Sequence, residues 1–247
     1  MITLALALAK AEFKLKNEGS YLGFFWYLVN PVLTFLLLWL IFSDRLGQNI
    51  PYYPVYIFLG VIMFNFFQSA LLESSRIIIH DYHYLIKSIN FPRQALILAI
   101  IFKHLFSHAA EIILLDIIML VFGLNPVYLL YYLPVLVVFA VFVFGMCLLI
   151  SALAVYVVDL ENICSFAVKI LWLGTPIFYA IGGQTRLFYL NLFNPLYYFI
   201  SAARILMISH AMPPAWLILG AAALSVGFAV IGWLVFGILK TKFAELI

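Results

Sequence analysis

Long apolar runs alternate with short polar segments along this chain. Six runs reach or approach the roughly 20 helical residues needed to cross about 30 Å of hydrocarbon. The third and fourth exceed one crossing, so we expect them to tilt or to project from the bilayer. The runs lie near residues 24–42, 55–74, 95–122, 132–158, 163–181 and 216–239. The pattern predicts an all-α integral membrane protein with a single transmembrane domain over residues 1–247.

The N-terminal segment, residues 4–18, has an amphipathic pattern. Its apolar residues recur at helical spacing and its charged residues lie on a different face, as in a helix that lies in the membrane interface. The alternative is a flank of the first span whose lysines extend to the interface. The apolar set is Leu4, Leu8, Ala11 and Leu15, and the charged set is Lys10, Lys14 and Glu18.

The segment 182–214 is interrupted by Gly-Gly, Asn-Pro and Pro-Pro pairs, but it is also rich in aromatic residues. The interruptions are unfavourable to a continuous span, and the aromatic content is unfavourable to a solvated loop. We therefore expect short re-entrant helices that dip into the outer leaflet before the last span.

Composition supports the membrane class. Hydrophobic residues make up 67% of the chain, charged residues 9%, and the mean hydropathy is +1.17. A soluble domain carries about 25% charged residues. The formal charge of +3 is too small, and the basic residues too dispersed, to indicate nucleic-acid binding. Cys147 and Cys164 lie in or beside apolar runs, which favours buried thiols over a disulfide.

The distribution of basic residues predicts the orientation. With a cytoplasmic N-terminus, eight basic residues fall on the cytoplasmic side and three on the outer side, which satisfies the positive-inside rule. The outer three are Arg45, Arg186 and Arg204. Both termini are then cytoplasmic, and residues 80–94 form a cytoplasmic connection between the second and third spans.

The sequence contains no phosphate-binding loop of the form G-x-x-x-x-G-K-[ST], no nucleophile elbow and no paired-cysteine zinc spacing. We therefore expect no enzyme activity, metal or cofactor in this chain by itself. The strongest polar cluster in a span is His104, His108 and Glu111, which share one helix face. They are interpreted as an interhelical hydrogen-bond set, with Lys103 neutralising Glu111 or Asp116; a proton relay and a metal site are the alternatives.

Lys169 lies inside the fifth apolar run. A buried pair with an acidic side chain on another helix is favoured over a catalytic lysine.

Aromatic residues, 18% of the chain, form clusters that suit either interface belts and helix packing or a pathway lined with rings for sugars. The candidate pathway residues are Phe24, Trp26, Tyr27, Phe67, Trp172, Phe178, Tyr179, Tyr197 and Tyr198.

Five segments, spread over about four fifths of the chain, carry a recognisable pattern in register. They are KNEGSYLGFFWYLVNPVL (16–33), YPVYIFLGVIMFNFF (53–67), NFPRQALILA (90–99), VDLENICSFAVKILWLGTPIFYAIG (158–182) and NLFNPLYYFISAARILM (191–207). Together they resemble the permease subunits of type-2 ABC exporters, especially those for O-antigen and teichoic acid polysaccharides. The resemblance departs from many relatives at the turn before the fifth run, where Val158 replaces an arginine before Asp159.

The resemblance implies a homodimer in the bacterial inner membrane that works with two copies of a separate ATPase, which would bind ATP and Mg²⁺. Residues 80–94 would dock on that ATPase, although each side chain could equally be ordinary cytoplasmic surface. The implied contact residues are His80, Asp81, Tyr82, Lys87 and Arg93.

The implied cargo is a glycan on a polyprenyl pyrophosphate. Its pyrophosphate suits a cationic interfacial site, for which Lys10, Lys14 and Lys16 lie at the right depth. A drug or small-lipid exporter on the same fold is the alternative. A glycan transferase or a membrane scaffold is less consistent with the residues, because the largest loop holds no Asp or Glu.

Overall fold

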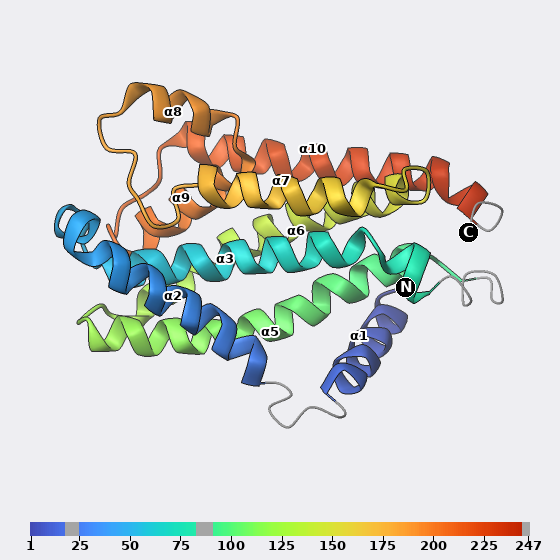
Figure 1. The fold of residues 1–247 in the computed structure, drawn as a ribbon, viewed down its shortest axis with the longest axis horizontal. Helices are drawn as coiled ribbons and strands as arrows, with labels where there is room; N and C mark the ends of the chain where they lie inside the picture. The colour runs from blue at the N-terminus through green and yellow to red at the C-terminus, as the bar shows by residue number, and fades with distance from the viewer. Residues whose placement is uncertain (18–24, 83–90, 244–247) are drawn as a thin grey trace.

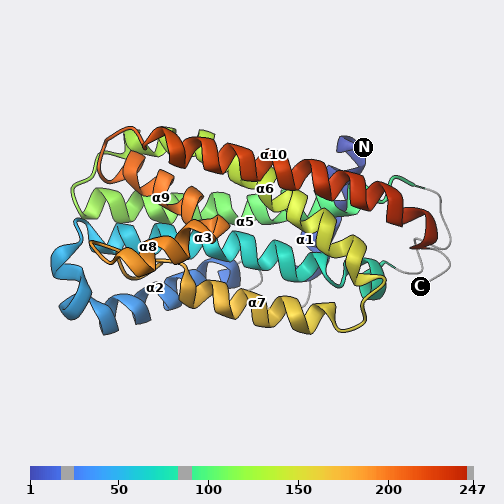
Figure 2. The same ribbon diagram turned by 90° about the horizontal axis from the view of Figure 1, so that it is seen from above.

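The computed structural model describes residues 1–17, 25–82 and 91–243, and every regular element there is helical (Figures 1 and 2). The long helices run along one common direction as a bundle. They are α2 (Phe25–Leu46), α3 (Tyr53–Ser74), α5 (Gln94–Val121), α6 (Leu129–Ala154), α7 (Leu160–Gly174) and α10 (Ala215–Leu239). The short elements are α1 (Ile2–Asn17), η1 (Gly47–Asn49), η2 (Ile77–Asp81), η3 (Pro126–Tyr128), α8 (Thr185–Leu192), α9 (Pro195–Met207) and η4 (Lys240–Lys242).

Within the described residues, five helical stretches are long and apolar enough to cross a membrane, which confirms five of the six predicted spans. They are Leu28–Asn49, Tyr53–Ile79, Gln94–Val121, Pro126–Ala154 and Ala215–Lys242. Helix α7 has 15 residues and is about 22 Å long, so the span predicted over 163–181 is wrong as a single helix. It stops because Thr175 precedes Pro176 and adopts an extended backbone.

Helix α3 forms the centre of the bundle and is buried along most of its length. It packs against α2, α5, α6, α7 and α9. Three of its phenylalanines, Phe58, Phe64 and Phe67, are fully buried. Because α3 is enclosed on most sides, its few accessible positions are the natural places to look for function.

Helices α6 and α10 pack very closely along the bundle, and two glycines permit this approach. A Cβ atom on Gly232 would lie 2.2 Å from the carbonyl oxygen of Gly145, and a Cβ on Gly145 would lie 2.4 Å from the backbone of Phe228. Such small residues let membrane helices approach backbone to backbone. The last span is therefore held by close contact with α6.

Helix α1 lies obliquely to the bundle beside the first half of α5 (Figure 1). Four alanines form the contact: Ala5 and Ala9 of α1 against Ala95 and Ala99 of α5, all fully buried. A helix is confirmed here, but the expected apolar face is partly wrong, because Ala11 is exposed. The small Ala5 and Ala9 face α5 because they allow the two helices to approach closely.

The start of α1 and the end of α10 lie at one end of the bundle, and α8 and α9 lie at the other (Figures 1 and 2). The short helices expected within 182–214 are therefore present, and their insertion into the outer leaflet stays a prediction. Helix α9 begins after Asn194, whose side chain accepts a hydrogen bond from the amide of Leu196 and donates one to Thr175 Oγ1 at 2.8 Å.

The glycine contact predicts opposite effects for two alanine substitutions on α10. Gly232→Ala should separate α6 from α10 and lower the thermal unfolding midpoint of the detergent-solubilised protein by several degrees, because the new methyl group meets backbone. Gly237→Ala is the matched control, since nothing lies within 4 Å of its Cβ position. It should leave the midpoint unchanged or raise it through helix propensity. Equal midpoints for the two variants would contradict the contact.

Candidate functional site

The accessible positions of α3 form a narrow polar stripe. Along a helix that is otherwise almost entirely buried, Asn65, Gln68 and Ser69 retain accessible surface at helical spacing i, i+3 and i+4. Two amides in an apolar span are costly in lipid unless they face protein, water or a ligand. The stripe therefore marks a face of α3 that does not meet hydrocarbon.

This face opens into a hollow of about 710 Å³ between α2, α3 and α7. Helix α7 presents its own polar stripe there, with Ser165 and Lys169 four residues apart and Trp172 one turn further on. Helix α2 adds Thr34, whose hydroxyl donates to the Asn30 carbonyl at 2.9 Å. We call this hollow the polar groove; its lining is Thr34, Asn65, Gln68, Leu72, Ser165, Val168, Lys169, Trp172 and Leu173.

The polar groove lies near the middle of the candidate span that α3 forms. Asn65 is nine residues before the end of α3 at Ser74, and Lys169 is nine residues after the start of α7 at Leu160. At 1.5 Å per residue, both lie about 14 Å from the same end of the bundle, close to half of a 30 Å hydrocarbon core. The arrangement supplies amides, hydroxyls, one ammonium group and one indole ring at that depth.

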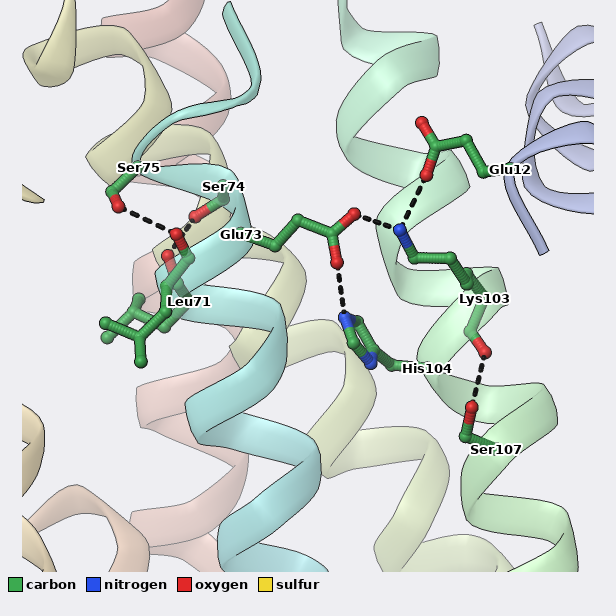
Figure 3. A network of polar contacts seen from close by, with 9 residues as sticks. Glu12, Leu71, Glu73, Ser74, Ser75, Lys103, His104 and Ser107 are labelled. Carbon is green, nitrogen blue, oxygen red and sulfur yellow. Dashed lines mark hydrogen bonds and ion pairs between the residues drawn. The ribbon is translucent and has the colours of Figure 1, made fainter. Parts of the chain in front are cut away.

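A separate buried ion network joins three helices at the end of the bundle that carries the termini (Figure 3). Lys103 of α5 forms ion pairs with Glu73 of α3 and with Glu12 of α1, the latter at 2.6 Å. The other oxygen of Glu73 contacts Nε2 of His104 at 3.0 Å. Tyr82, which follows η2, donates its hydroxyl proton to Glu12 at 2.6 Å.

The partners of Lys103 correct the sequence analysis, which assigned it to Glu111 or Asp116. Glu111 instead contacts Nδ1 of His108 at 2.8 Å, and Nε2 of His108 contacts the hydroxyl of Tyr132 on α6 at 2.7 Å. His104 and His108 therefore belong to two different networks. Both networks join α5 to another helix, as the interhelical hydrogen-bond interpretation expects. Within the described part of the chain, no three His, Cys, Asp or Glu side chains gather as metal ligands would.

Arg204 is a polar residue whose role the sequence analysis missed. It was counted with the outer loop charges, but it is 6% exposed and its guanidinium lies 3.4 Å from the ring centroid of Tyr56. It donates to the carbonyls of Tyr56, Pro176 and Ile177. The Thr175-Pro176 pair was the signal in the sequence that could have predicted this role. It indicates a helix end, and the free carbonyls at a helix end need hydrogen-bond donors.

The carbonyls of residues 176–179, just after α7, accept hydrogen bonds from side chains of neighbouring helices. While Arg204 binds the carbonyls of Pro176 and Ile177, the hydroxyl of Tyr53 donates to the Phe178 carbonyl at 2.6 Å. The hydroxyl of Tyr56 donates to the next carbonyl, that of Tyr179, at 2.9 Å. Non-helical backbone within a bundle is stable only when its polar groups are paired in this way.

Comparison with known sequences identifies the family. The pattern of the ABC-2 type transporter family matches residues 3–208. The chain belongs to this family. It is 25% identical over 246 residues, 98% of this chain and 94% of the relative, to a protein of Myxococcus xanthus named O-antigen export system permease protein RfbA. Two proteins of that name from Klebsiella pneumoniae are each 24% identical over 250 and 252 residues, 100% of this chain and 96% of each relative.

In this ABC-2 transporter chain the nine aromatic candidates do not share one surface. Of the candidates that the structure describes, only Trp172 lines the polar groove, and Tyr197 lines a separate hollow of about 320 Å³ that also contains Arg204. Phe67 is a core residue, fully buried, which overturns its assignment to a pathway. Three others make contacts inside the chain and one is exposed: Phe178 stacks on Phe42, Tyr179 donates to Gly174, Tyr198 donates to Leu192, and Trp26 is exposed. Phe24 and the side chain of Tyr27 lie outside the described residues.

The candidate docking and lipid-binding residues gather at the end with the termini. Arg93 donates to the Lys240 carbonyl and lies 5.7 Å from the ring centroid of Phe243, so it joins the start of α5 to the end of α10. Lys10 and Lys14 are exposed on α1. Lys87 and the side chains of Lys16, His80 and Asp81 lie outside what the structure describes.

The expected pair between Lys169 and an acid of another helix is wrong for the described residues, whose ion pairs involve other groups.

The ion network predicts that Lys103 is essential for folding. Lys103→Met should leave the buried carboxylate of Glu73 and the partly buried carboxylate of Glu12 without their cation. Loss of one partner of a buried pair destabilises a protein by about 3–5 kcal/mol. We expect a strong fall in the yield of monodisperse protein after solubilisation, measured by size-exclusion chromatography. Lys242→Met, at an exposed position of the same end, is the control and should behave as the wild type. A normal yield of Lys103→Met protein would show that the network is dispensable.

Proposed function

We propose that this chain is the transmembrane subunit of an ATP-driven exporter that moves a polyprenyl-pyrophosphate-linked polysaccharide across the bacterial inner membrane. The observation that carries the proposal is the polar groove at mid-membrane depth in a chain of the ABC-2 family. The names of the relatives, O-antigen export permeases, support a polysaccharide as the cargo.

The chemistry of the polar groove suits a hydroxyl-rich chain. A sugar that enters the membrane gives up hydrogen bonds to water, and each unreplaced bond costs free energy. The amides of Asn65 and Gln68 can both donate and accept, so they fit hydroxyl groups in any orientation. The indole of Trp172 offers a flat face to the apolar C–H side of a sugar ring.

Two copies of the chain would enclose the conduit. The polar groove is open on one side, and a hollow of about 710 Å³ in one copy is small for a polymer. The helices that flank it, α2 and α7, expose large apolar side chains that a second copy would cover in a symmetric dimer. These residues are Leu33, Leu36, Leu37, Leu40, Ile163, Phe166, Ile170 and Leu173.

In this proposal, the sixth crossing is completed by α7 together with residues 175–181, in which the carbonyls of residues 176–179 are paired with side chains of α3 and α9. Six crossings place both termini on the cytoplasmic side, in keeping with the basic residues there. The ATPase would dock at that end, near Tyr82, where the ion network joins α1, α3 and α5. A movement of the docking segment would then reach the central helix through Glu12, Lys103 and Glu73.

A double substitution in the polar groove tests the conduit. Asn65→Leu with Gln68→Leu removes both amides of α3, so sugars in transit lose hydrogen-bond partners. We expect export of surface polysaccharide to fall at least about tenfold, measured by gel staining of glycan from cells that depend on this permease. Protein level and recovery of the ATPase should stay normal. Gln48→Leu, an exposed amide in η1, is the control. Normal export by the double variant would reject the polar groove as the conduit.

A charge reversal tests the docking segment. Lys87→Glu should reduce recovery of a phosphate-loop ATPase with the tagged permease, because a favourable contact becomes repulsive. Arg93→Glu would also break the contact with Lys240, so its size-exclusion profile must be checked alongside. Lys242→Glu serves as the matched reversal elsewhere at this end. If Lys87→Glu retains full ATPase recovery and full export, residues 80–94 are not the docking site.

A further inference from the structure

Lys169 places a positive charge in the polar groove without a matching negative charge. It is exposed on α7 at mid-membrane depth, and the ion pairs of the described residues leave it out. A charge at this depth is unfavourable unless it meets water, an opposite charge or a ligand. By contrast, Lys103 and Arg204 are buried in the described part of the bundle and have partners inside the chain.

Among the described residues, no acidic side chain supplies the missing charge at that depth. Glu111 is the described acid nearest to the middle of its span, but it is buried against His108 on α5. Glu73 is held by Lys103 and His104. The other described acids lie toward the helix ends: Glu12, Asp44, Asp116, Asp159 and Glu161. A second copy of the chain would bring these same acids at the same depths.

The neighbours of Lys169 are suited to an anion. Asn65, Gln68 and Ser165 line the same hollow with neutral groups that can donate hydrogen bonds to anionic oxygens. An ammonium group recognises phosphate or carboxylate as a charge and does not require a forked geometry. Among the described residues that line the hollow, none is acidic and would repel such a ligand.

We propose that Lys169, with the amides of Asn65 and Gln68, binds an anionic group of the cargo, a phosphate or a carboxylate, as the cargo crosses the membrane. The proposal rests on the proposed function and narrows it to cargo that carries negative charge at mid-membrane depth. Two sources supply that chemistry: the pyrophosphate that joins the glycan to its lipid, and acidic sugars in the glycan itself. The site differs from the exposed lysines of α1, which lie at the membrane surface.

Direct binding to the full-length permease in neutral phosphatidylcholine nanodiscs tests the proposal without the ATPase or transport. The anionic probes are farnesyl pyrophosphate and a short oligoglucuronate, and their neutral counterparts are farnesol and an oligoglucose of equal length. The variants are Lys169→Gln, which removes the charge, Lys169→Arg, which keeps it, and Lys10→Gln as the surface control. Unchanged size-exclusion profiles ensure that each variant is folded.

We expect Lys169→Gln to weaken binding of one anionic probe at least about tenfold while Lys169→Arg stays within about threefold of the wild type. If Lys169→Gln loses binding of farnesyl pyrophosphate only, the site recognises the pyrophosphate of the lipid anchor. If it loses binding of oligoglucuronate only, the site recognises acidic sugars. The proposal is overturned if neither anionic probe binds the wild type more tightly than its neutral counterpart, or if Lys169→Gln binds both normally. If only Lys10→Gln weakens binding of an anionic probe, the anion binds at the exposed face of α1 and not at Lys169. Export defects in the polar-groove variants would still support the proposed function in each of these cases.

Discussion

A charged side chain inside a bilayer must meet an opposite charge, hydrogen-bond partners or a ligand, and this constraint organises the whole bundle. Lys103 satisfies it by binding Glu73 and Glu12, so that α1, α3 and α5 are joined at one end. Arg204 satisfies it at the other end by binding backbone carbonyls that α7 leaves free when it stops at Gly174. A truncated helix and an oblique N-terminal helix are both stable because a buried cation completes their hydrogen bonds.

The two cations also explain why α3 can be the central element. Its ends are fixed by polar contacts, through Glu73 at one end and through Tyr53 and Tyr56 at the other. Apolar packing is not directional, and in lipid it gives little preference for one helix arrangement over another. The polar contacts supply that preference. With its ends fixed and its sides covered, α3 exposes a narrow stripe, and the amides in that stripe line the polar groove.

The sequence predicts the spans well because length and hydropathy are local properties, and the ends of α3, α5 and α10 fall within two residues of expectation. It fails for the fifth run, where Thr175-Pro176 ends the helix inside a stretch that is still apolar. Which charged residues pair with each other is not a local property of the sequence. Glu12, Glu73 and Lys103 are far apart in the chain, so spacing on a single helix suggested Glu111 or Asp116 for Lys103 instead. Spacing also grouped His104 with His108, whereas the structure places them in separate networks.

Lys169 is the informative exception to the pairing rule. If the polar groove were only a gap between protomers, selection for stability would favour an apolar residue at this position, because an unpaired ammonium at mid-depth is unfavourable. A charge that the fold does not satisfy is retained when something that passes through the site satisfies it. Lys103 and Arg204 are buried and paired inside the chain, whereas Lys169 faces the open polar groove. This contrast indicates that the charge of Lys169 serves the site and not the stability of the fold. In the proposed cargo site, the neutral amides of the polar groove would bind hydroxyl groups and its single ammonium group would bind an anionic one.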